Sequence, residues 1–227
     1  KSYLSLDTST ADAEAMLPRR SDAHLDMAMR AFPGLRILRQ PFGETLLGFL
    51  CSATKQIVQI KQMLALLAEH HGSPLPTTCH LIDDKPVRAL PTWTQLAELS
   101  EEQLRGCQLG FRARYIKGTA DFLAAHPGWL EQTATLPYAD AKAALCILPG
   151  VGEKIADCVA LFGLGHLAAF PVDTWMIKTM SRRYGLTGWS PTQVAHFGRV
   201  HFGPVAGLAQ QYLFAWERAH GKDLSSD

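Results

Sequence analysis

Apolar residues recur along most of this chain at the three- and four-residue spacing of amphipathic helices. In the segment 57–72 they share one helical face, and a glycine follows as the expected C-terminal cap: Ile57, Ile60, Met63, Leu64, Leu67 and Gly72. The same reasoning predicts helices over 21–32, 45–51, 109–126, 174–184, 190–202 and 205–220, with a short one from Ser100. Only Tyr3–Asp7 alternates as a strand does. The pattern therefore predicts an all-α body.

Local signals mark where several of these helices begin and end. Ser21, Ser100 and Ser190 are expected N-caps, and the last two are each followed three residues later by a glutamine, which completes a capping box. Gly185 and Gly221 are expected to end helices. The Pro- and Thr-rich segment 73–91 is expected to be an irregular surface loop.

One stretch, Leu145–Arg183, combines these signals with candidate chemistry. Pro149 should stop an apolar helix, and Gly150 and Gly152 should permit unusual backbone angles before a new helix starts at Glu153 or Lys154. Two helices joined by so short a turn form a helix-hairpin-helix, whose exposed N–H groups bind an anion such as a DNA phosphate.

Two charged residues of this stretch suggest reaction chemistry. Asp173 follows Pro171-Val172 and is placed as the N-cap of the helix that starts at Thr174, where backbone N–H groups hold its carboxylate ionised. Lys154 lies in the first turn of its own helix, where the helix dipole favours the neutral, nucleophilic amine. A fixed carboxylate and an activated amine are the pair that chemistry at a sugar C1′ needs.

This pattern resembles the helix-hairpin-helix DNA glycosylase superfamily, and most closely its bifunctional 8-oxoguanine glycosylase/lyase branch. The resemblance rests on Leu148-Pro149-Gly150-Val151-Gly152-x-Lys154-x-Ala156-Asp157-Cys158 and on Pro171-Val172-Asp173, and it runs from about Tyr3 to Glu217. It implies two helical lobes, 42–140 and 21–41 plus 141–227, with a DNA- and base-binding cleft between them. Residues 1–20 would then be the end of an N-terminal β-domain whose larger part lies upstream.

The resemblance also assigns roles. Lys154 would attack C1′ and form a Schiff base, and Asp173 would stabilise the oxocarbenium-like charge. The flipped base would be held by Cys158, Phe214, Gln210, Glu217 and Pro171, and the DNA backbone by Gly150, Val151, Gly152, Lys154 and Trp175. Thr54, Gln59, Phe111 and Arg112 would enter the duplex or read the opposite base. The carbonyls of Cys146, Leu148 and Val151 match those that bind a structural cation in similar hairpins, and no catalytic metal or cofactor is expected.

The chain departs from the family pattern at three places. Trp175 stands where the family commonly has histidine, and Thr54, Lys55, Gln56 and Gln59 stand where it has an asparagine run and an arginine. The glycine whose carbonyl reads N7–H of 8-oxoguanine belongs to the upstream domain.

Residue types alone leave other interpretations open. Cys158 and Phe214 lie at core spacing and suit simple packing, and a phenylalanine followed by arginine is also a common core-and-surface pair. The chain could act on another damaged purine, such as an alkylated one, although that branch generally lacks the lysine. A non-catalytic DNA-binding hairpin is the third alternative.

Composition bounds the cellular setting. The net charge of +1 lacks the basic excess of a nucleic-acid binder, so any DNA footprint must be local. The five cysteines have no zinc or iron–sulfur spacing, which indicates free thiols in a reducing compartment: Cys51, Cys79, Cys107, Cys146 and Cys158. No stretch of this sequence is long and apolar enough to span a membrane, and no signal peptide is visible in it. We expect a monomer acting on double-stranded DNA with oxidised guanine, in the cytoplasm or nucleoid of a prokaryote or the nucleus of a eukaryote.

Overall fold

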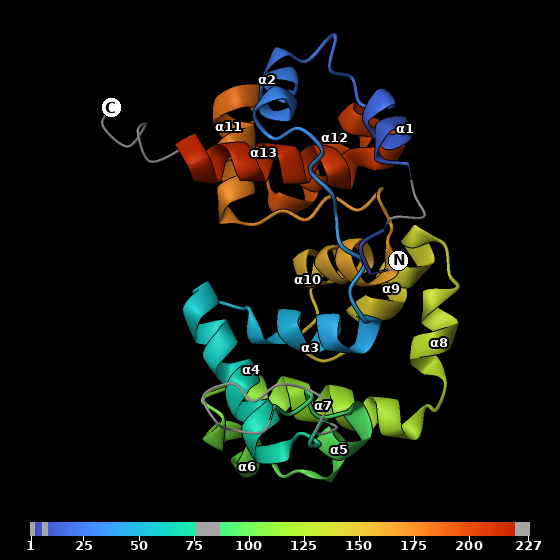
Figure 1. Cartoon of the computed structure of the whole chain (residues 1–227), viewed down its shortest axis with the longest axis vertical. Helices are drawn as coiled ribbons and strands as arrows, with labels where there is room; N and C mark the ends of the chain where they lie inside the picture. Colours follow the sequence, from blue (N-terminus) through green and yellow to red (C-terminus); the bar gives the residue numbers. More distant parts are fainter. Residues whose placement is uncertain (1–2, 6–8, 76–86, 221–227) are drawn as a thin grey trace. The chain divides into compact units, whose positions relative to one another are not determined.

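The computed structural model describes residues 3–5, 9–75 and 87–220 (Figure 1). Apart from one isolated bridge pair, Pro74 with Arg88, the regular structure in these ranges is helical, which confirms the predicted class. The longer helices are α2 (Ala23–Ala31), α3 (Phe42–Cys51), α4 (Ile57–His71), α7 (Arg112–Ala125), α9 (Tyr138–Cys146), α11 (Thr174–Tyr184), α12 (Pro191–Phe202) and α13 (Ala206–His220). The shorter ones are α1 (Thr10–Ala15), α5 (Trp93–Glu98), α6 (Glu101–Gly106), α8 (Trp129–Ala134), α10 (Glu153–Val159), the π-helix η1 (Ala160–Leu164) and the 3₁₀ turn η2 (Gly203–Val205).

The chain forms two compact units, residues 1–41 with 153–227, and residues 42–152. The second unit includes residues 141–152, which the sequence prediction grouped with the first. Packing explains this assignment, because α9 contacts α8 and the Thr119 hydroxyl on α7 donates to the Pro149 carbonyl at 3.3 Å.

In the first unit, α13 packs against α2, α11 and α12 around a common core (Figure 1). The largest fully buried side chains there are Phe170, Phe202 and Tyr212. The backbone N–H of Gly207 donates to the Leu167 carbonyl at 2.7 Å, which joins the start of α13 to the segment that follows η1. This unit carries Lys154 and Asp173.

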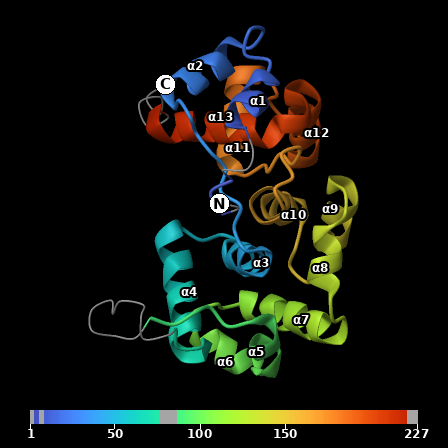
Figure 2. The same cartoon turned by 45° about the vertical axis from the view of Figure 1, so that its right-hand side comes forward.

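In the second unit, α7 is the central helix (Figure 2). It packs against α3, α5 and α6, and α3 in turn contacts α4 and α8. The capping box predicted at Ser100 is present, and Gly72 caps α4 as predicted.

The N-terminal prediction needs correction. Tyr3–Ser5 form a turn rather than a strand, and Leu6 and Asp7 lie outside the described residues. Thr10–Ala15, expected to belong to a β-domain, form α1, because the Ser9 side chain accepts the N–H of Asp12 and so caps a helix.

The cap of α2 also differs from the prediction. Asp22, not Ser21, is the N-cap, because the Asp22 carboxylate accepts the N–H of Leu25 at 2.9 Å while the Ser21 hydroxyl turns back to the Pro18 carbonyl. The prediction also missed α5 and α8, which are only six residues long. The expected stop at Gly221 and most of the 73–91 loop, namely 76–86, lie outside the described residues.

Candidate active site

The turn between α9 and α10 has the expected local structure. Gly150 adopts a left-handed φ of 78°, and a Cβ there would lie 2.5 Å from Cγ of Tyr115, so only glycine fits. Gly152 does not have a positive φ, and the expectation of unusual angles at both glycines is wrong for it. The N–H of Val151 donates to the Leu148 carbonyl at 3.1 Å and closes the turn.

The predicted nucleophile and carboxylate both lie at helix starts. Lys154 is half-buried in the first turn of α10, which begins at Glu153 as predicted. Asp173 is the N-cap of α11, and its Oδ1 accepts the backbone N–H of Met176 at 2.8 Å, which confirms the predicted cap. That bond fixes the carboxylate in one orientation.

The pKa of the Cys158 thiol responds to both Lys154 and Asp173, so these two side chains lie near the thiol. Burial raises the pKa of Cys158 to about 12; the Lys154 charge opposes this rise, and the Asp157 and Asp173 charges add to it. At neutral pH Cys158 is therefore an uncharged thiol. The first unit thus places the Lys154 amine and the Asp173 carboxylate near the uncharged Cys158 thiol.

A cavity of about 180 Å³ adjoins the lysine. Lys154, Asp157 and Val172 line it together with the start of α12. A larger cavity of about 350 Å³ in the same unit is mainly apolar and contains none of the predicted site residues. Of these two cavities, only the smaller one is lined by Lys154.

The helix that carries Lys154 continues into a feature that the sequence did not indicate. Residues Ala160–Leu164 form the π-helix η1, which ends at Gly165 with a φ of 78°. Such turns occur frequently at functional sites. Nothing in the amino-acid sequence distinguishes a π-helical turn from an ordinary α-helix.

Three predicted base-pocket residues share one face of α13, at positions 210, 214 and 217. Gln210 is buried, and its Oε1 accepts a bond from Nε2 of Gln211 at 2.6 Å. Phe214 is half-buried, and the Arg218 guanidinium lies 5.8 Å from its ring centroid. Pro171 is also buried, in the segment leading to Asp173.

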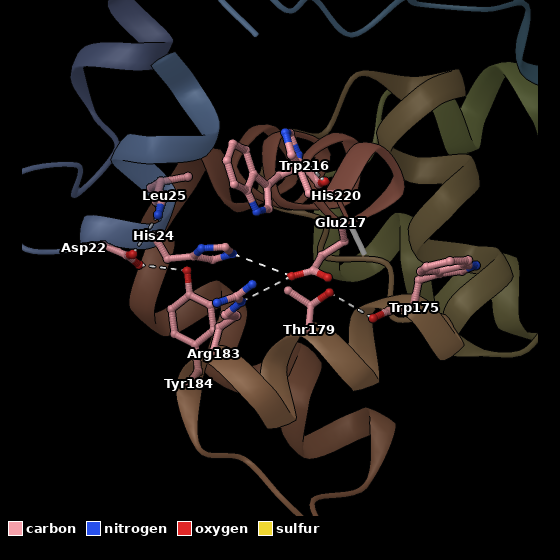
Figure 3. A network of polar contacts seen from close by, with 10 residues as sticks. All are labelled: Asp22, His24, Leu25, Trp175, Thr179, Arg183, Tyr184, Trp216, Glu217 and His220. Atoms are coloured by element: carbon pink, nitrogen blue, oxygen red, sulfur yellow. Dashed lines mark hydrogen bonds and ion pairs between the residues drawn. The ribbon is translucent and has the colours of Figure 1, made fainter. Parts of the chain in front are cut away.

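Glu217 is a buried carboxylate held between two helices (Figure 3). Its Oε1 lies 3.5 Å from Nε of Arg183 on α11 and 3.9 Å from Nε2 of His24 on α2. Burial lowers the pKa of His24, the Arg183 charge lowers it further, and Glu217 and Asp22 oppose this. Arg183 is therefore the charged partner at neutral pH. The sequence analysis did not find these partners of Glu217, because His24 is distant in the chain and has no local motif.

Trp175 lies on the first turn of α11 and is 43% exposed. Its indole ring points away from Glu217 (Figure 3). Its backbone carbonyl accepts the Thr179 hydroxyl at 3.0 Å.

In the second unit the predicted opposite-base residues differ in exposure. Phe111 is 45% exposed at the start of α7, whereas Arg112 is only 2% exposed. The Arg112 guanidinium donates to the carbonyl of Ala53 and to Oγ1 of Thr54, the latter at 2.9 Å. Gln59 is exposed, and its Oε1 accepts the N–H of Gln56 at 3.2 Å in the capping box of α4.

Comparison with known proteins identifies the family of this chain. The family of HhH-GPD superfamily base excision DNA repair proteins matches residues 47–201. The chain belongs to the HhH-GPD superfamily. This membership confirms the resemblance inferred from the hairpin and from Pro171-Val172-Asp173.

The most similar members of the HhH-GPD superfamily include an Arabidopsis thaliana protein named N-glycosylase/DNA lyase OGG1. It is 35% identical over 237 residues, which cover 98% of this chain and 62% of that protein. The chain thus spans less than two thirds of the length of this curated relative.

Two solved structures of the Clostridium acetobutylicum 8-oxoguanine glycosylase/lyase share the fold. Its apo form has a TM-score of 0.86 and 35% identity, covering 94% of this chain and 72% of that one. Its complex with double-stranded DNA that contains cytosine opposite 8-oxoguanine has a TM-score of 0.88 and 34% identity, covering 97% of this chain and 73% of that one.

No helix within the described ranges of our chain has the length and apolar character to cross a membrane.

Proposed function

We propose that this HhH-GPD protein is a bifunctional base-excision repair enzyme that removes 8-oxoguanine from duplex DNA and then cleaves the abasic site. The proposal is carried by one observation: the Lys154 charge lowers and the Asp173 charge raises the pKa of the buried Cys158 thiol, so the amine and the carboxylate both lie near this thiol in a single compact unit. The similarity to glycosylase/lyases supports the same reaction class. The enzyme acts as a monomer in the compartment that holds the DNA.

The reaction starts when the target nucleotide leaves the base stack, at a cost of a few kcal/mol. Nζ of Lys154 attacks C1′ with its electron pair, and the electron pair of the glycosidic bond leaves with the base, which takes up the proton that the amine loses. Asp173 stabilises the positive charge that develops on the sugar, and its bond from Met176 keeps the carboxylate in place. The nitrogen lone pair then forms the C1′=N bond and breaks the bond from C1′ to the ring oxygen; this oxygen keeps the electron pair and takes up a proton, which gives the Schiff base between Lys154 and C1′.

The lyase step follows from that Schiff base. The iminium acidifies C2′–H; removal of this proton sends the electron pair into a new C2′–C3′ double bond, and the 3′ phosphate leaves. Hydrolysis of the remaining imine frees Lys154 for the next turnover.

The base pocket consists of Cys158 and Phe214 on the two faces of the base and Gln210 at its Watson–Crick edge. An uncharged thiol suits contact with a π-face, because it adds no charge to desolvate. Glu217 and Pro171 complete the pocket. Glu217 is already held by Arg183, so its carboxylate is oriented before DNA binds.

Both units contribute DNA contacts. In the second unit the turn at Gly150, Val151 and Gly152 contacts the DNA backbone. In the first unit the amine of Lys154 and the exposed indole of Trp175 contact the DNA backbone. In the second unit the exposed ring of Phe111 wedges into the duplex. Ile57 and Val58, which are 53% and 74% exposed at the start of α4, offer further apolar contact with the opened base step.

A structural cation would bind at the carbonyls of Cys146, Leu148 and Val151. The Leu148 carbonyl already accepts the Val151 N–H, and its second lone pair remains for an ion. This ion would stiffen the turn and takes no part in bond cleavage.

The test compares three duplexes with one sequence: 8-oxoguanine opposite cytosine, an alkylated purine at the same position, and undamaged guanine. We expect release of 8-oxoguanine, strand cleavage 3′ to the lesion, and covalent trapping by borohydride only on the first duplex. Excision of the alkylated purine alone would identify an alkylbase glycosylase. Equal binding of all three duplexes without base release would identify a non-catalytic module, and either result overturns the proposal.

A further inference from the structure

The second unit contains a cluster of metal-ligating side chains outside the proposed active site. His70, His71 and Cys107 each place one ligand atom within 4.8 Å of the others. Sγ of Cys107 lies 4.0 Å from Nδ1 of His70. We propose that these three residues bind a divalent transition-metal ion of the zinc type, which clamps α4 to α6.

The donor set selects the kind of ion. Two imidazole nitrogens and one thiolate suit zinc, cobalt, nickel or copper, whereas magnesium and calcium require oxygen ligands. A tetrahedral zinc ion with Zn–N near 2.0 Å and Zn–S near 2.3 Å needs ligand atoms about 3.3–3.6 Å apart. The cluster therefore has to contract by roughly 1 Å, which the exposed ring of His70 can supply by rotating. Water would take the fourth position.

The backbone on the α4 side is held in place. Gly72 follows the two histidines, and a Cβ there would lie 1.9 Å from the Ala89 carbonyl. The N–H of Ala89 donates to the Ser73 carbonyl at 3.0 Å, and Arg88 donates to the Gly72 carbonyl at 2.8 Å. The end of α4 is thus anchored, and the imidazoles are presented from a rigid element.

The backbone on the α6 side is equally defined. Cys107 is the C-cap of α6 and is fully buried, with its N–H bonded to the Leu104 carbonyl at 3.0 Å. A ring nitrogen of His71 hydrogen-bonds the backbone carbonyl of Gln103 on the same helix. This bond orients the His71 ring relative to α6.

Electrostatics favour a cation at this place. His70 and His71 form the last turn of α4, and Cys107 is the C-cap of α6, so the C-terminal ends of two helices meet at the cluster. The negative ends of both helix dipoles stabilise positive charge there. Binding replaces the Cys107 S–H bond by a metal–thiolate bond and releases one proton to solvent.

The experiment uses the whole chain after removal of metal with a chelator. Cobalt(II) is titrated into wild type, a His70→Ala/His71→Ala double variant, Cys107→Ser, and the control His196→Ala, which removes an exposed histidine of α12. We expect one equivalent of cobalt to produce a thiolate-to-cobalt charge-transfer band in wild type and in His196→Ala. The band should be absent in Cys107→Ser, and affinity should fall at least tenfold in the double variant.

Thermal melting with zinc provides an independent readout. Zinc should raise Tm by several degrees in wild type and in His196→Ala, and should not raise it in the double variant, because only a folded site binds the ion. Absence of the charge-transfer band in wild type overturns the proposal whether or not the variants fold. So does an equal zinc-induced rise of Tm in wild type and the double variant.

Discussion

The Arg112 guanidinium on α7 donates to Oγ1 of Thr54 at 2.9 Å, although 58 residues separate them in the chain. Thr54 has a φ of 53°, a left-handed conformation that is rare outside glycine. Arg112 also donates to the carbonyls of Ala53 and Leu109. The arginine predicted to read the opposite base therefore holds the loop before α4, and it must exchange these bonds to reach DNA.

The first prediction concerns the stability that this arginine contributes. Arg112→Ala should lower the free energy of unfolding by roughly 2–3 kcal/mol, because charged hydrogen bonds are lost and buried carbonyls lose their donor. Urea denaturation measures the change. The neighbouring Arg114→Ala, which removes an exposed arginine bonded to the Tyr115 hydroxyl, should change it by no more than about 0.5 kcal/mol. Equal effects in the two variants would contradict the role of the buried bonds.

The second prediction concerns choice of the opposite base. Gln59 is neutral and can both donate and accept, so it satisfies bases other than cytosine. Gln59→Arg should sharpen the preference for cytosine by about 1–3 kcal/mol, measured as single-turnover excision on four duplexes that differ only in that base. Gln59→Ala is the control, because it also removes the capping bond to Gln56 but adds no charge. An unchanged preference in Gln59→Arg would show that this position does not read the base.

The third prediction concerns the nucleophile. Lys154→Gln should abolish borohydride trapping on 8-oxoguanine DNA, because an amide cannot form a Schiff base. Lys61→Gln, which removes an exposed lysine of α4, should be trapped as wild type is. Undiminished trapping of Lys154→Gln would remove this lysine from its role.

The fourth prediction separates the two tasks of Asp173. Asp173→Asn keeps an oxygen that can accept the Met176 N–H, so the free energy of unfolding should fall by roughly 1 kcal/mol or less. Base excision should fall by orders of magnitude, because the stabilising charge is gone. Melting curves measure whether Asp173→Asn stays folded, and single-turnover excision measures its activity. A variant that is as active as wild type, or one that is unfolded, would contradict the role assigned to Asp173.

The fifth prediction concerns pH. The folded state holds the pKa of His24 below its ordinary value of 6.5, mainly through burial. The unfolded chain therefore binds a proton near pH 6.5 that the folded chain does not, so stability is lost as pH falls from about 7 towards the lowered pKa. The groups that face His24 are Arg183, Glu217, Asp22, Tyr184 and Trp216.

Chemical denaturation at a series of pH values tests this. Wild type should lose more stability than His24→Gln over this window, by at most about 1.4 kcal/mol per pH unit. Because His71 also has a lowered pKa and remains in both proteins, only the difference between the two proteins is informative. Parallel pH profiles would show that His24 does not contribute.

The sequence by itself determined the parts of this protein that depend on neighbouring residues. The turn at Gly150, the start of α10 before Lys154, the Asp173 cap and the Ser190 capping box follow from backbone preferences and short-range hydrogen bonds. These features also identified the superfamily. They are predictable because each is decided within a few residues.

The tertiary structure alone decided what distant residues do together. It buried Arg112 against Ala53 and Thr54, set Glu217 beside Arg183 and His24, and joined Cys107 to the end of α4. It also placed Asp22 rather than Ser21 at the start of α2, where its other oxygen accepts the Tyr184 hydroxyl at 3.0 Å. Such partners are chosen by the packing of whole helices, and a side chain's own sequence neighbours carry no information about which helix will cover it.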